Sequence, residues 1–482
     1  MRILKKILKW AGIVIGGLLI LSIIIHTVLN IVWGRELRDK LAELKAKGEP
    51  ITIAEIRPAP VPDKENAAVL YNKVFMLMTS GEGGKPYIPN KEGGKENKTI
   101  GIIEDVKFYS DISKWTEKQR QEVPKLVNSP DMQYIYALLE QASKRPECNF
   151  NLRYGDGAAM LLPHLAKMRS LARLLCVKAL IEADAGKTDK SFNTVLTGLR
   201  ISNHLKNEPV LISQLVRIAC DRIVINCLEP LSSKYSISQE RMKSLITELE
   251  NHVGTEPFKK CMDTERICLA GVEFNKLLKR KYSIKELKAL FGSSDDFFLK
   301  LVYIEVTPPF KPLLKKDFVC YLSFMSDMKE LYNMSYSESV IAGRNIELKL
   351  KTGISKYCVL TRMLVPALTR VREQMSLHEA QIQVCRTGLA LKIYKAKYGT
   401  YPDSLFLHSL DKLTPDILKK VPSDPFTDRN LIYKRAKHGF ILYSLGSNMK
   451  DDGGTPGFRG KAKTDAQRKA KKDYDIVWKR EK

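Results

Sequence analysis

Four oxygen-bearing side chains near the C-terminus occur in a pattern that suits a hard cation. Asn448, Asp451 and Asp452 lie in a glycine-rich segment at 446–457, and Asp475 follows soon after it. Ca²⁺ takes about six to eight oxygen ligands from carboxylates, amide and backbone carbonyls and water. Glycines let the backbone turn tightly around such an ion. The segment therefore predicts a calcium site, and the alternative is a solvated acidic turn without an ion.

Short strands are expected to position these side chains. Apolar and polar residues alternate at 431–433 and at 440–444, on either side of a turn at 437–439, and this pattern predicts a β-hairpin. The alternating run 474–478 predicts a closing strand, which carries Asp475. We therefore expect a small module of antiparallel strands, with the acidic segment between its second and third strands.

Five short motifs follow one another through this part of the chain. They are Tyr-Pro-Asp-Ser-Leu at 401–405, Pro-Ser-Asp-Pro-Phe at 422–426, Tyr-Ser-Leu-Gly-Ser-Asn at 443–448, Asp-Asp-Gly-Gly at 451–454 and Asp-Ile-Val-Trp at 475–478. Their order resembles the C-terminal globular domain of the major pseudopilin of type II secretion systems. The resemblance covers about a quarter of the chain, and the rest resembles no family.

The resemblance implies a calcium site, because in that family the matching loop binds calcium. It implies a ligand set of one backbone carbonyl and four side chains: Leu445, Asn448, Asp451, Asp452 and Asp475. Asn448 stands where the family usually has an acidic ligand, and the basic segment 459–472 lengthens the loop. The chain also lacks the processing site of that family, a glycine with a glutamate at the fifth following position. Assembly into a pilus core is therefore not expected.

An apolar stretch from Ala11 to Trp33 predicts a transmembrane helix near the N-terminus. At about 1.5 Å per residue it spans the ~30 Å hydrocarbon layer. Trp10 and Trp33 flank it, where indoles prefer the membrane interface. Basic residues at 2–9, with no acidic residue among them, favour a cytoplasmic N-terminus. Because no small-residue cleavage site follows, we expect an uncleaved signal anchor in the cytoplasmic membrane and a periplasmic bulk.

The expected fold is mainly α. Apolar residues recur at three- and four-residue spacing through 130–350 and predict an irregular domain of α-hairpins. A long helix from about 356 to 397 then leads into the small α+β module with antiparallel strands, and Gly399 is its expected stop. The expected division is a transmembrane signal anchor at 1–34, a connector and mobile loop region at 35–128, the α-helical domain at 129–355, and the long helix with the pseudopilin-like module at 356–482.

The charge of the chain suggests an anionic partner. Lys and Arg number 80 against 54 Asp and Glu, which gives a net charge of +26. Such an excess attracts lipid headgroups, acidic envelope polymers or nucleic acid, although a soluble, self-repelling surface is the alternative. Nucleic acid is not expected, because no recognised binding motif accompanies the charge. The triplet at 279–281 is the candidate contact with anionic polymer, and a solvated helix end is its alternative.

Motifs of known catalytic sites are missing from the sequence. His378-Glu379 lacks the second histidine of a His-Glu-x-x-His zinc motif, and no nucleophile elbow, Walker loop or dinucleotide fingerprint occurs. His164 and His204 lie on apolar helices and are expected to be satisfied core residues. The nine cysteines contain no Cys-x-x-Cys pair, so we expect buried apolar thiols rather than zinc ligands. We name no catalytic residue.

These features favour a non-catalytic, membrane-anchored envelope protein with a structural or interaction role linked to secretion or the cell surface. Its expected partners are the membrane and proteins of the envelope or of a secretion apparatus. Two alternatives stay open. One is a binder of anionic envelope polymers or lipids through the basic surface, and the other is a periplasmic hydrolase with an unfamiliar active site.

Overall fold

The computed structural model describes most of the chain. It covers residues 2–78, 111–279, 310–355, 357–404, 409–437, 439–456 and 474–478, together with 283, 285 and 288. The expected mobile loop at 79–98, most of the basic triplet at 279–281 and the basic segment 459–472 lie outside these residues.

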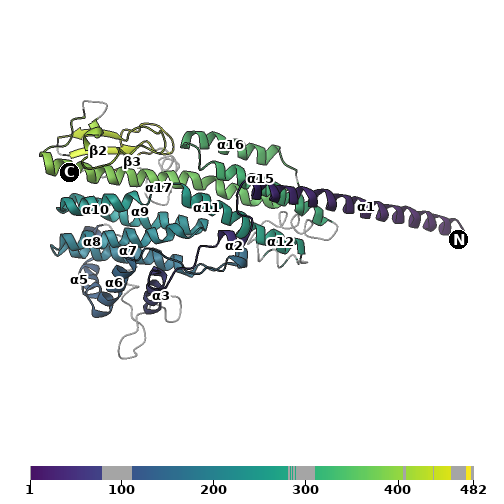
Figure 1. The fold of residues 1–482 in the computed structure, drawn as a ribbon, viewed down its shortest axis with the longest axis horizontal. Coiled ribbons are helices and arrows are strands. Elements are labelled where there is room, and N and C mark those ends of the chain that lie inside the picture. The colour runs from purple at the N-terminus through teal and green to yellow at the C-terminus, as the bar shows by residue number, and fades with distance from the viewer. Residues whose placement is uncertain are drawn as a thin grey trace.

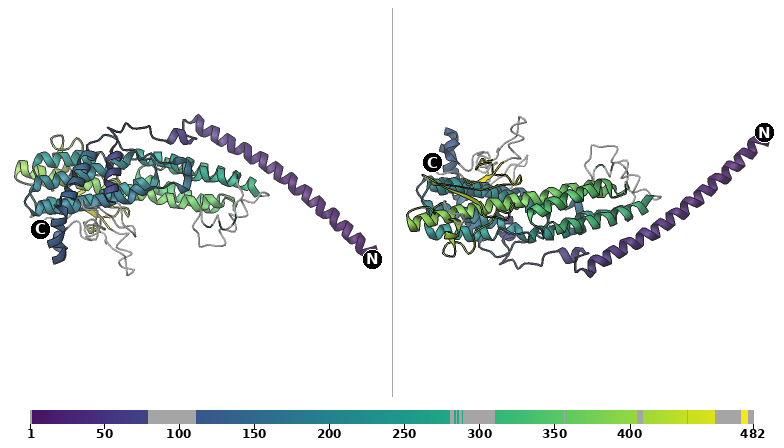
Figure 2. Two further views of the ribbon diagram at one scale, coloured as in Figure 1. Left: turned by 90° about the horizontal axis from the view of Figure 1, so that it is seen from below. Right: turned by 90° about the horizontal axis from the view of Figure 1, so that it is seen from above.

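A single long helix, α1 (Arg2–Ala46), projects from one end of an elongated helical body. The N-terminus and the C-terminal module lie at opposite ends of the molecule (Figure 1), and two further views show the first half of α1 leaving the body (Figure 2). Within the part of the chain that is described, α1 is the one helix long and apolar enough to cross a membrane, and no residue of its most apolar window is buried. The prediction of an N-terminal helix that could span a membrane is therefore confirmed.

The second half of α1 is docked on helix α15 (Lys311–Glu330). The Lys315 ammonium donates to Asn30 Oδ1 at 2.7 Å, and the Lys316 ammonium donates to Glu36 Oε1 at 2.6 Å. These contacts join the middle of α1 to the body. The docked half then ends at Gly48, which has a left-handed φ of 72°.

Helices build the body between the anchor and the module. Helices α7 and α8 pack side by side, as do α7 and α9, which agrees with the predicted α-hairpins. The helices of the body are α2 (Ile53–Ile56), α3 (Ala67–Leu77), α5 (Glu117–Val127), α6 (Pro130–Ser143), α7 (Pro163–Asp184), α8 (Thr188–Asn203), α9 (Leu211–Lys234), α10 (Gln239–Glu250), α11 (Glu256–Thr264), the π-helix η4 (Glu265–Gly271), α12 (Val272–Lys279) and α16 (Tyr336–Thr352).

The long helix α17 (Val359–Tyr398) runs along the body and carries the C-terminal module. It ends at Gly399, whose φ of 77° is the left-handed stop expected from the sequence. Strands β1 (Ile432–Ala436), β2 (Gly439–Ser444) and β3 (Ile476–Val477) then form an antiparallel sheet in the order β1-β2-β3. The predicted hairpin, closing strand and mainly α fold class are all confirmed.

The module is seated on α17 through Trp478, which is fully buried. The indole lies against Gly388 so closely that a Cβ at that glycine would be 2.6 Å from the ring. Phe440 stacks on the same indole from β2. One hydrophobic cluster extends from α3 through α7, α8, α9 and α17 to Trp478, so the body and the module share a core. The four predicted segment boundaries stay predictions.

Candidate calcium site and the buried clusters of the body

A buried carboxylate fixes the start of the predicted calcium loop. Asp424 lies in the Asp-Pro-Phe turn and is 1% exposed. Its Oδ1 accepts from Ser444 Oγ at 2.9 Å, and its Oδ2 accepts from the Leu445 N–H at 2.9 Å. Burial raises the pKa of Asp424, although the bonds it accepts from Phe426, Leu445 and Ser444 oppose the rise. Asp424 therefore joins its own turn to the end of β2, which is a structural role, as expected for this motif.

A second buried carboxylate fixes the end of the same loop. Asp475 directly precedes β3 and is 1% exposed. Its Oδ2 accepts from the Gly454 N–H at 2.8 Å and from the Thr455 N–H at 3.2 Å. The Asp475 N–H donates in turn to the Thr455 carbonyl at 3.0 Å. The left-handed φ of 74° at Gly454 lets the backbone present these N–H groups.

The other oxygen of Asp475 is the strongest indication of a cation. Asp475 Oδ1 is buried and has no hydrogen-bond partner among the described residues. Burial raises the pKa of Asp475 against the backbone hydrogen bonds from Gly454, Thr455 and Asp452, and the nearby Asp452 carboxylate adds to the rise. Asp452 Oδ2 also accepts from Asn448 Nδ2 at 2.9 Å. The structure therefore brings three predicted ligands, Asn448, Asp452 and Asp475, to one part of the loop.

Asp451 and Leu445 have other contacts. Asp451 Oδ1 accepts from the Tyr443 hydroxyl at 2.7 Å and from the Gly453 N–H at 2.9 Å, and the Tyr443 bond lowers the pKa of Asp451. The carboxylate thus closes a turn back onto β2. The Leu445 N–H is bound to Asp424, and this contact places Leu445 at the first position of the loop.

These residues fit a hard cation only with help from neutral ligands. The described residues contain no group of three or more His, Cys, Asp or Glu that could hold a metal. A calcium ion beside Asp475 Oδ1 and Asp452 would take its remaining ligands from the Asn448 amide, backbone carbonyls and water. The ion would offset the repulsion between the two carboxylates. Calcium binding therefore stays a prediction, carried by one buried oxygen.

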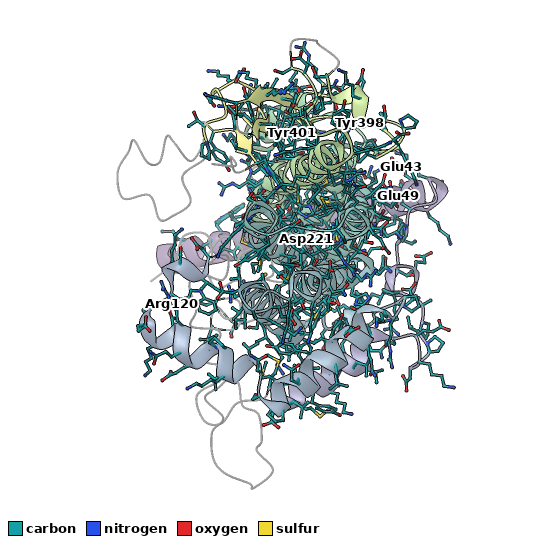
Figure 3. The ribbon with its side chains drawn as sticks, turned by 90° about the vertical axis from the view of Figure 1, so that its left-hand side faces the viewer. Glu43, Glu49, Arg120, Asp221, Tyr398 and Tyr401 are labelled. Atoms are coloured by element: carbon teal, nitrogen blue, oxygen red, sulfur yellow. The ribbon has the colours of Figure 1, made fainter. Side chains whose placement is uncertain are left out.

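A buried polar cluster that was not predicted from the sequence is centred on Asp221 of α9. Its Oδ1 lies 2.9 Å from His252 Nδ1, and its Oδ2 lies 2.7 Å from His378 Nε2. The Ser202 hydroxyl donates to Oδ1 as well. Each of the four residues is at most 2% exposed, and Asp221 lies amid the packed helices (Figure 3).

The charges of this cluster are set by its geometry. Burial opposes ionisation of Asp221, but the charge of His252 and the bonds from both histidines hold the pKa of Asp221 well below its usual range. Burial likewise opposes protonation of His252, yet Asp221 raises the pKa of that imidazole. Burial lowers the pKa of His378 to about 4. Asp221 therefore favours the protonated form of His252, while His378 is neutral near neutral pH and is a further donor. An acid within an apolar helix, as at Asp221, is the sequence signal that could have revealed it.

The histidines expected to be core residues are satisfied, as predicted. His164 Nε2 lies 3.0 Å from Glu208 Oε1, and both residues are buried. His204 Nδ1 lies 2.6 Å from the Tyr71 hydroxyl, while its Nε2 lies 3.0 Å from the Arg145 carbonyl.

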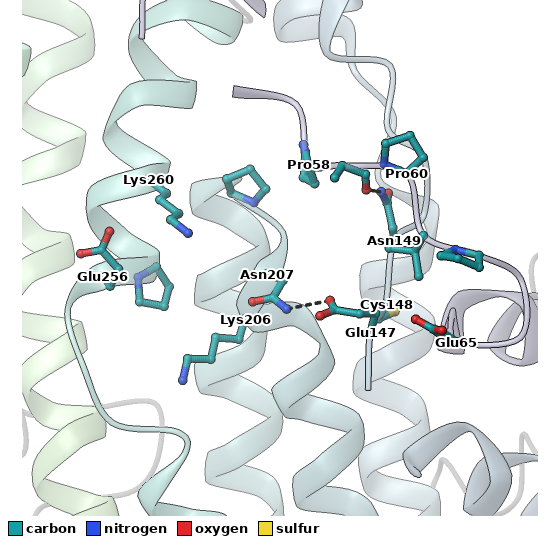
Figure 4. A pocket seen from close by; sticks show the side chains of 15 residues that line it. Pro58, Pro60, Glu65, Glu147, Cys148, Asn149, Lys206, Asn207, Glu256 and Lys260 are labelled. Atoms are coloured by element: carbon teal, nitrogen blue, oxygen red, sulfur yellow. Dashed lines mark hydrogen bonds between the residues drawn. The ribbon is translucent and has the colours of Figure 1, made fainter. Parts of the chain in front are cut away.

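A hollow of about 460 Å³ opens beside the proline-rich connector. Figure 4 shows Glu65 and Glu147 on one side and Lys206, Glu256 and Lys260 on the other. Burial raises the pKa of the Cys148 thiol in its wall, which disfavours a nucleophilic thiolate. None of the described residues that line it is a histidine. Its lining therefore provides no nucleophile paired with an imidazole base.

Comparison with family models, with curated proteins and with solved structures finds no match to this chain.

Proposed function

We propose that this chain is a single-pass envelope protein that holds a pseudopilin-like interaction module outside the cytoplasmic membrane. The observation that carries the proposal is the division of α1 into a bare apolar half and a docked polar half. Large apolar side chains of the first half, such as Ile13, Leu18 and Ile23, are more than half exposed. Exposed apolar surface of this size on one helix needs an apolar environment. A membrane supplies that environment.

The polar half of α1 supports an anchor that is fixed to the body. Lys315 and Lys316 join Asn30 and Glu36 across the two helices, and Leu44 is buried against the same region. The helical body would then stand upright on the membrane, with the module at its far end (Figure 1). A module held in this way suits contacts with proteins of the envelope or of a secretion apparatus. That choice of partner follows from the resemblance to the major pseudopilin.

Calcium would stiffen the module at residues 445–455, the described loop that follows β2. Asp424 and Asp475 already hold the two ends of this loop by its backbone N–H groups. A cation bound by Asp475 Oδ1 and Asp452 would fix the middle of the loop as well. The proposed role of the ion is therefore structural, and the chemistry that it supplies is charge neutralisation.

The topology can be tested with the full chain in bacterial membranes. An enzyme reporter that is active only outside the cytoplasm is fused after residue 482, and a cytoplasm-only reporter is fused at the same position in a matched strain. We expect activity from the first reporter and none from the second. The reverse pattern would contradict the proposal, because it would place the module inside the cell.

Calcium binding can be tested by thermal unfolding of the detergent-solubilised full chain. Binding to the folded state stabilises it by about 2.7 kcal/mol at a hundredfold excess over Kd. We expect the unfolding temperature to rise with calcium chloride. Sodium chloride at the same ionic strength should leave it unchanged. An unchanged transition at millimolar calcium would remove the ion from the proposal and leave the topology untouched.

A further inference from the structure

Two cysteines that are far apart in the sequence meet at the membrane-proximal end of the body. Cys320 lies on α15, and Cys358 is the residue that precedes α17. Their sulfur atoms are 2.9 Å apart, and 38 positions separate them in the chain. Cys358 is fully buried, whereas Cys320 is partly exposed. We propose that Cys320 and Cys358 form a disulfide in the mature protein. The proposal rests on the extracytoplasmic placement given under Proposed function, since disulfides persist in oxidising compartments.

The backbone around the pair is already held in place. Asp317, one helical turn before Cys320, accepts from the Leu360 N–H at 2.7 Å and from the Thr361 N–H at 3.0 Å. The Thr361 hydroxyl donates to the same carboxylate. Asp317 therefore fixes the first turn of α17 against α15, with the two sulfurs beside it. A disulfide requires side chains that point toward one another, and the 2.9 Å separation of the two sulfurs shows that these side chains converge.

Thiol–disulfide exchange needs one accessible thiol that ionises readily, and Cys320 fits this description better than the buried Cys358. The hydrogen bond with Cys358 lowers the pKa of Cys320, and the charge of Lys316 lowers it further. Because the thiolate is the nucleophile, the exposed Cys320 is the sulfur that an oxidant would meet first. By contrast, burial raises the pKa of Cys176 well above its usual range. Cys176 is therefore a matched control.

The proposed oxidant is another disulfide, either in an oxidising protein of the same compartment or in oxidised glutathione. The Cys320 thiolate attacks one sulfur of that disulfide, the disulfide bond breaks, and one thiolate leaves. Cys358, having lost its proton, then attacks the Cys320 sulfur and releases the second thiolate. Cys320 and Cys358 together lose two protons and two electrons, and the oxidant gains them as two thiols.

The disulfide would join the helix that docks the anchor to the helix that carries the module. Lys315 and Lys316 of α15 hold α1, as described above, and α17 reaches the module at Gly388. Figure 1 shows α15 beside the start of α17. The link would therefore add a covalent cross-link between α15 and α17, while α1 stays joined to α15 by the contacts of Lys315 and Lys316.

The test counts thiols in the full chain recovered from membranes. Samples are quenched in acid, denatured and labelled with a maleimide polymer, with and without prior reduction. Nine cysteines are present, so nine minus the bonded pair leaves seven labelled without reduction, and nine after it. Cys320→Ser should label at eight positions in both samples, because its partner becomes free. Cys176→Ser should label at six and then eight. Nine labels without reduction, in a protein whose reporter lies outside the cytoplasm, would overturn the proposal.

A second measurement separates this inference from the topology. If the reporters place the body inside the cell, the purified, reduced chain is treated with oxidised glutathione. Closure of the pair, and an unfolding transition several degrees higher that Cys320→Ser lacks, would support the site while the topology fails. A chain that keeps nine free thiols under glutathione would overturn the site, whatever the topology.

Discussion

The centre of the body and the C-terminal module each bury an aspartate, but the two carboxylates differ in their hydrogen-bond partners. In the body, both oxygens of Asp221 have partners, His252, His378 and Ser202. In the module, one oxygen of Asp475 accepts two backbone N–H groups, and the other accepts none among the described residues. The pKa of Asp221 is held low and the pKa of Asp475 is raised.

This difference separates a structural acid from an acid that can still bind. A buried carboxylate whose two oxygens both have partners has its charge compensated inside the fold, so it offers little to a ligand. A buried carboxylate with one free oxygen beside another acid gains from an added cation. The comparison therefore assigns a structural role to Asp221 and makes Asp475 the candidate ligand of the proposed calcium site.

The largest effect is expected from removing the buried charge of Asp221 in the body. Asp221→Asn removes the charge that compensates His252 in a site with no water access, so we expect a loss of about 3–5 kcal/mol in the free energy of unfolding. Chemical denaturation of the solubilised chain measures it. Asp416→Asn, which removes an exposed ion pair with Lys397, is the control and should change little. Equal, small losses in both variants would show that the cluster is not a source of stability.

The pH dependence of the same cluster gives the next effect. The pKa of His378 is lowered to about 4 by burial, whereas an unfolded histidine titrates near ~6.5. The unfolded state therefore binds the proton first, and stability falls as pH falls from about 6.5 to 4, by an amount on the order of 3 kcal/mol. His252 has the opposite sign: its raised pKa gives stability that is present below about pH 6.5 and is lost as pH rises through the folded pKa.

The variant His378→Gln tests this assignment, because the amide can still donate to Asp221 and cannot be protonated. We expect the free energy of unfolding of the variant to vary less than that of the wild type between pH 6.5 and 4. Parallel curves for the two proteins would show that another group causes the acid sensitivity.

In the module, the calcium response of two variants tests whether Asp475 is a ligand. Asp475→Asn keeps an oxygen for the Gly454 and Thr455 N–H groups but removes the charge, so the gain of about 2.7 kcal/mol at a hundredfold excess of calcium should be lost. Asp451→Asn should keep most of that gain, since Asp451 is engaged with Tyr443. Titration calorimetry on the full chain measures both variants. A larger loss in Asp451→Asn than in Asp475→Asn would reverse the assignment of the ligands.

The smallest effect is expected at the contact between the body and the module, where Gly388 packs against Trp478. Gly388→Ala places a methyl group against the Trp478 ring, and such overpacking costs about 1–3 kcal/mol. Gly343→Ala, on α16 with no atom within 4 Å of its Cβ, should be neutral or slightly stabilising. Protease cleavage within 400–478 reports whether the module detaches. Equal cleavage of the two variants would mean that this contact tolerates the methyl group.

Local patterns predicted much of the fold. The apolar run of α1, the stop of α17 at Gly399 and the β1–β2 hairpin each depend on neighbours in sequence, so periodicity and glycine placement were sufficient. The Asp221 cluster joins side chains 157 positions apart, and no local pattern records that distance. The same holds for Lys315 and Asn30, which lie 285 positions apart.

The candidate site was predictable in position but not in detail. The acidic loop and Asp475 were found from residue type and order. The orientation of Asp451 was not, because Tyr443 of the adjacent strand competes for its carboxylate. Asp424 was expected to be structural, but its bond to Leu445 depends on how two distant turns pack.

The length of α17 fixes the distance between the α1–α15 contacts and the module. The helix starts beside Asp317, near the level of the anchor contacts, and meets Trp478 at Gly388. With 1.5 Å of rise per residue, the 27 steps from Thr361 to Gly388 amount to roughly 40 Å. Under the proposed topology, this rigid helix would hold the module at a set height above the membrane surface, so that only a partner of comparable height could contact it.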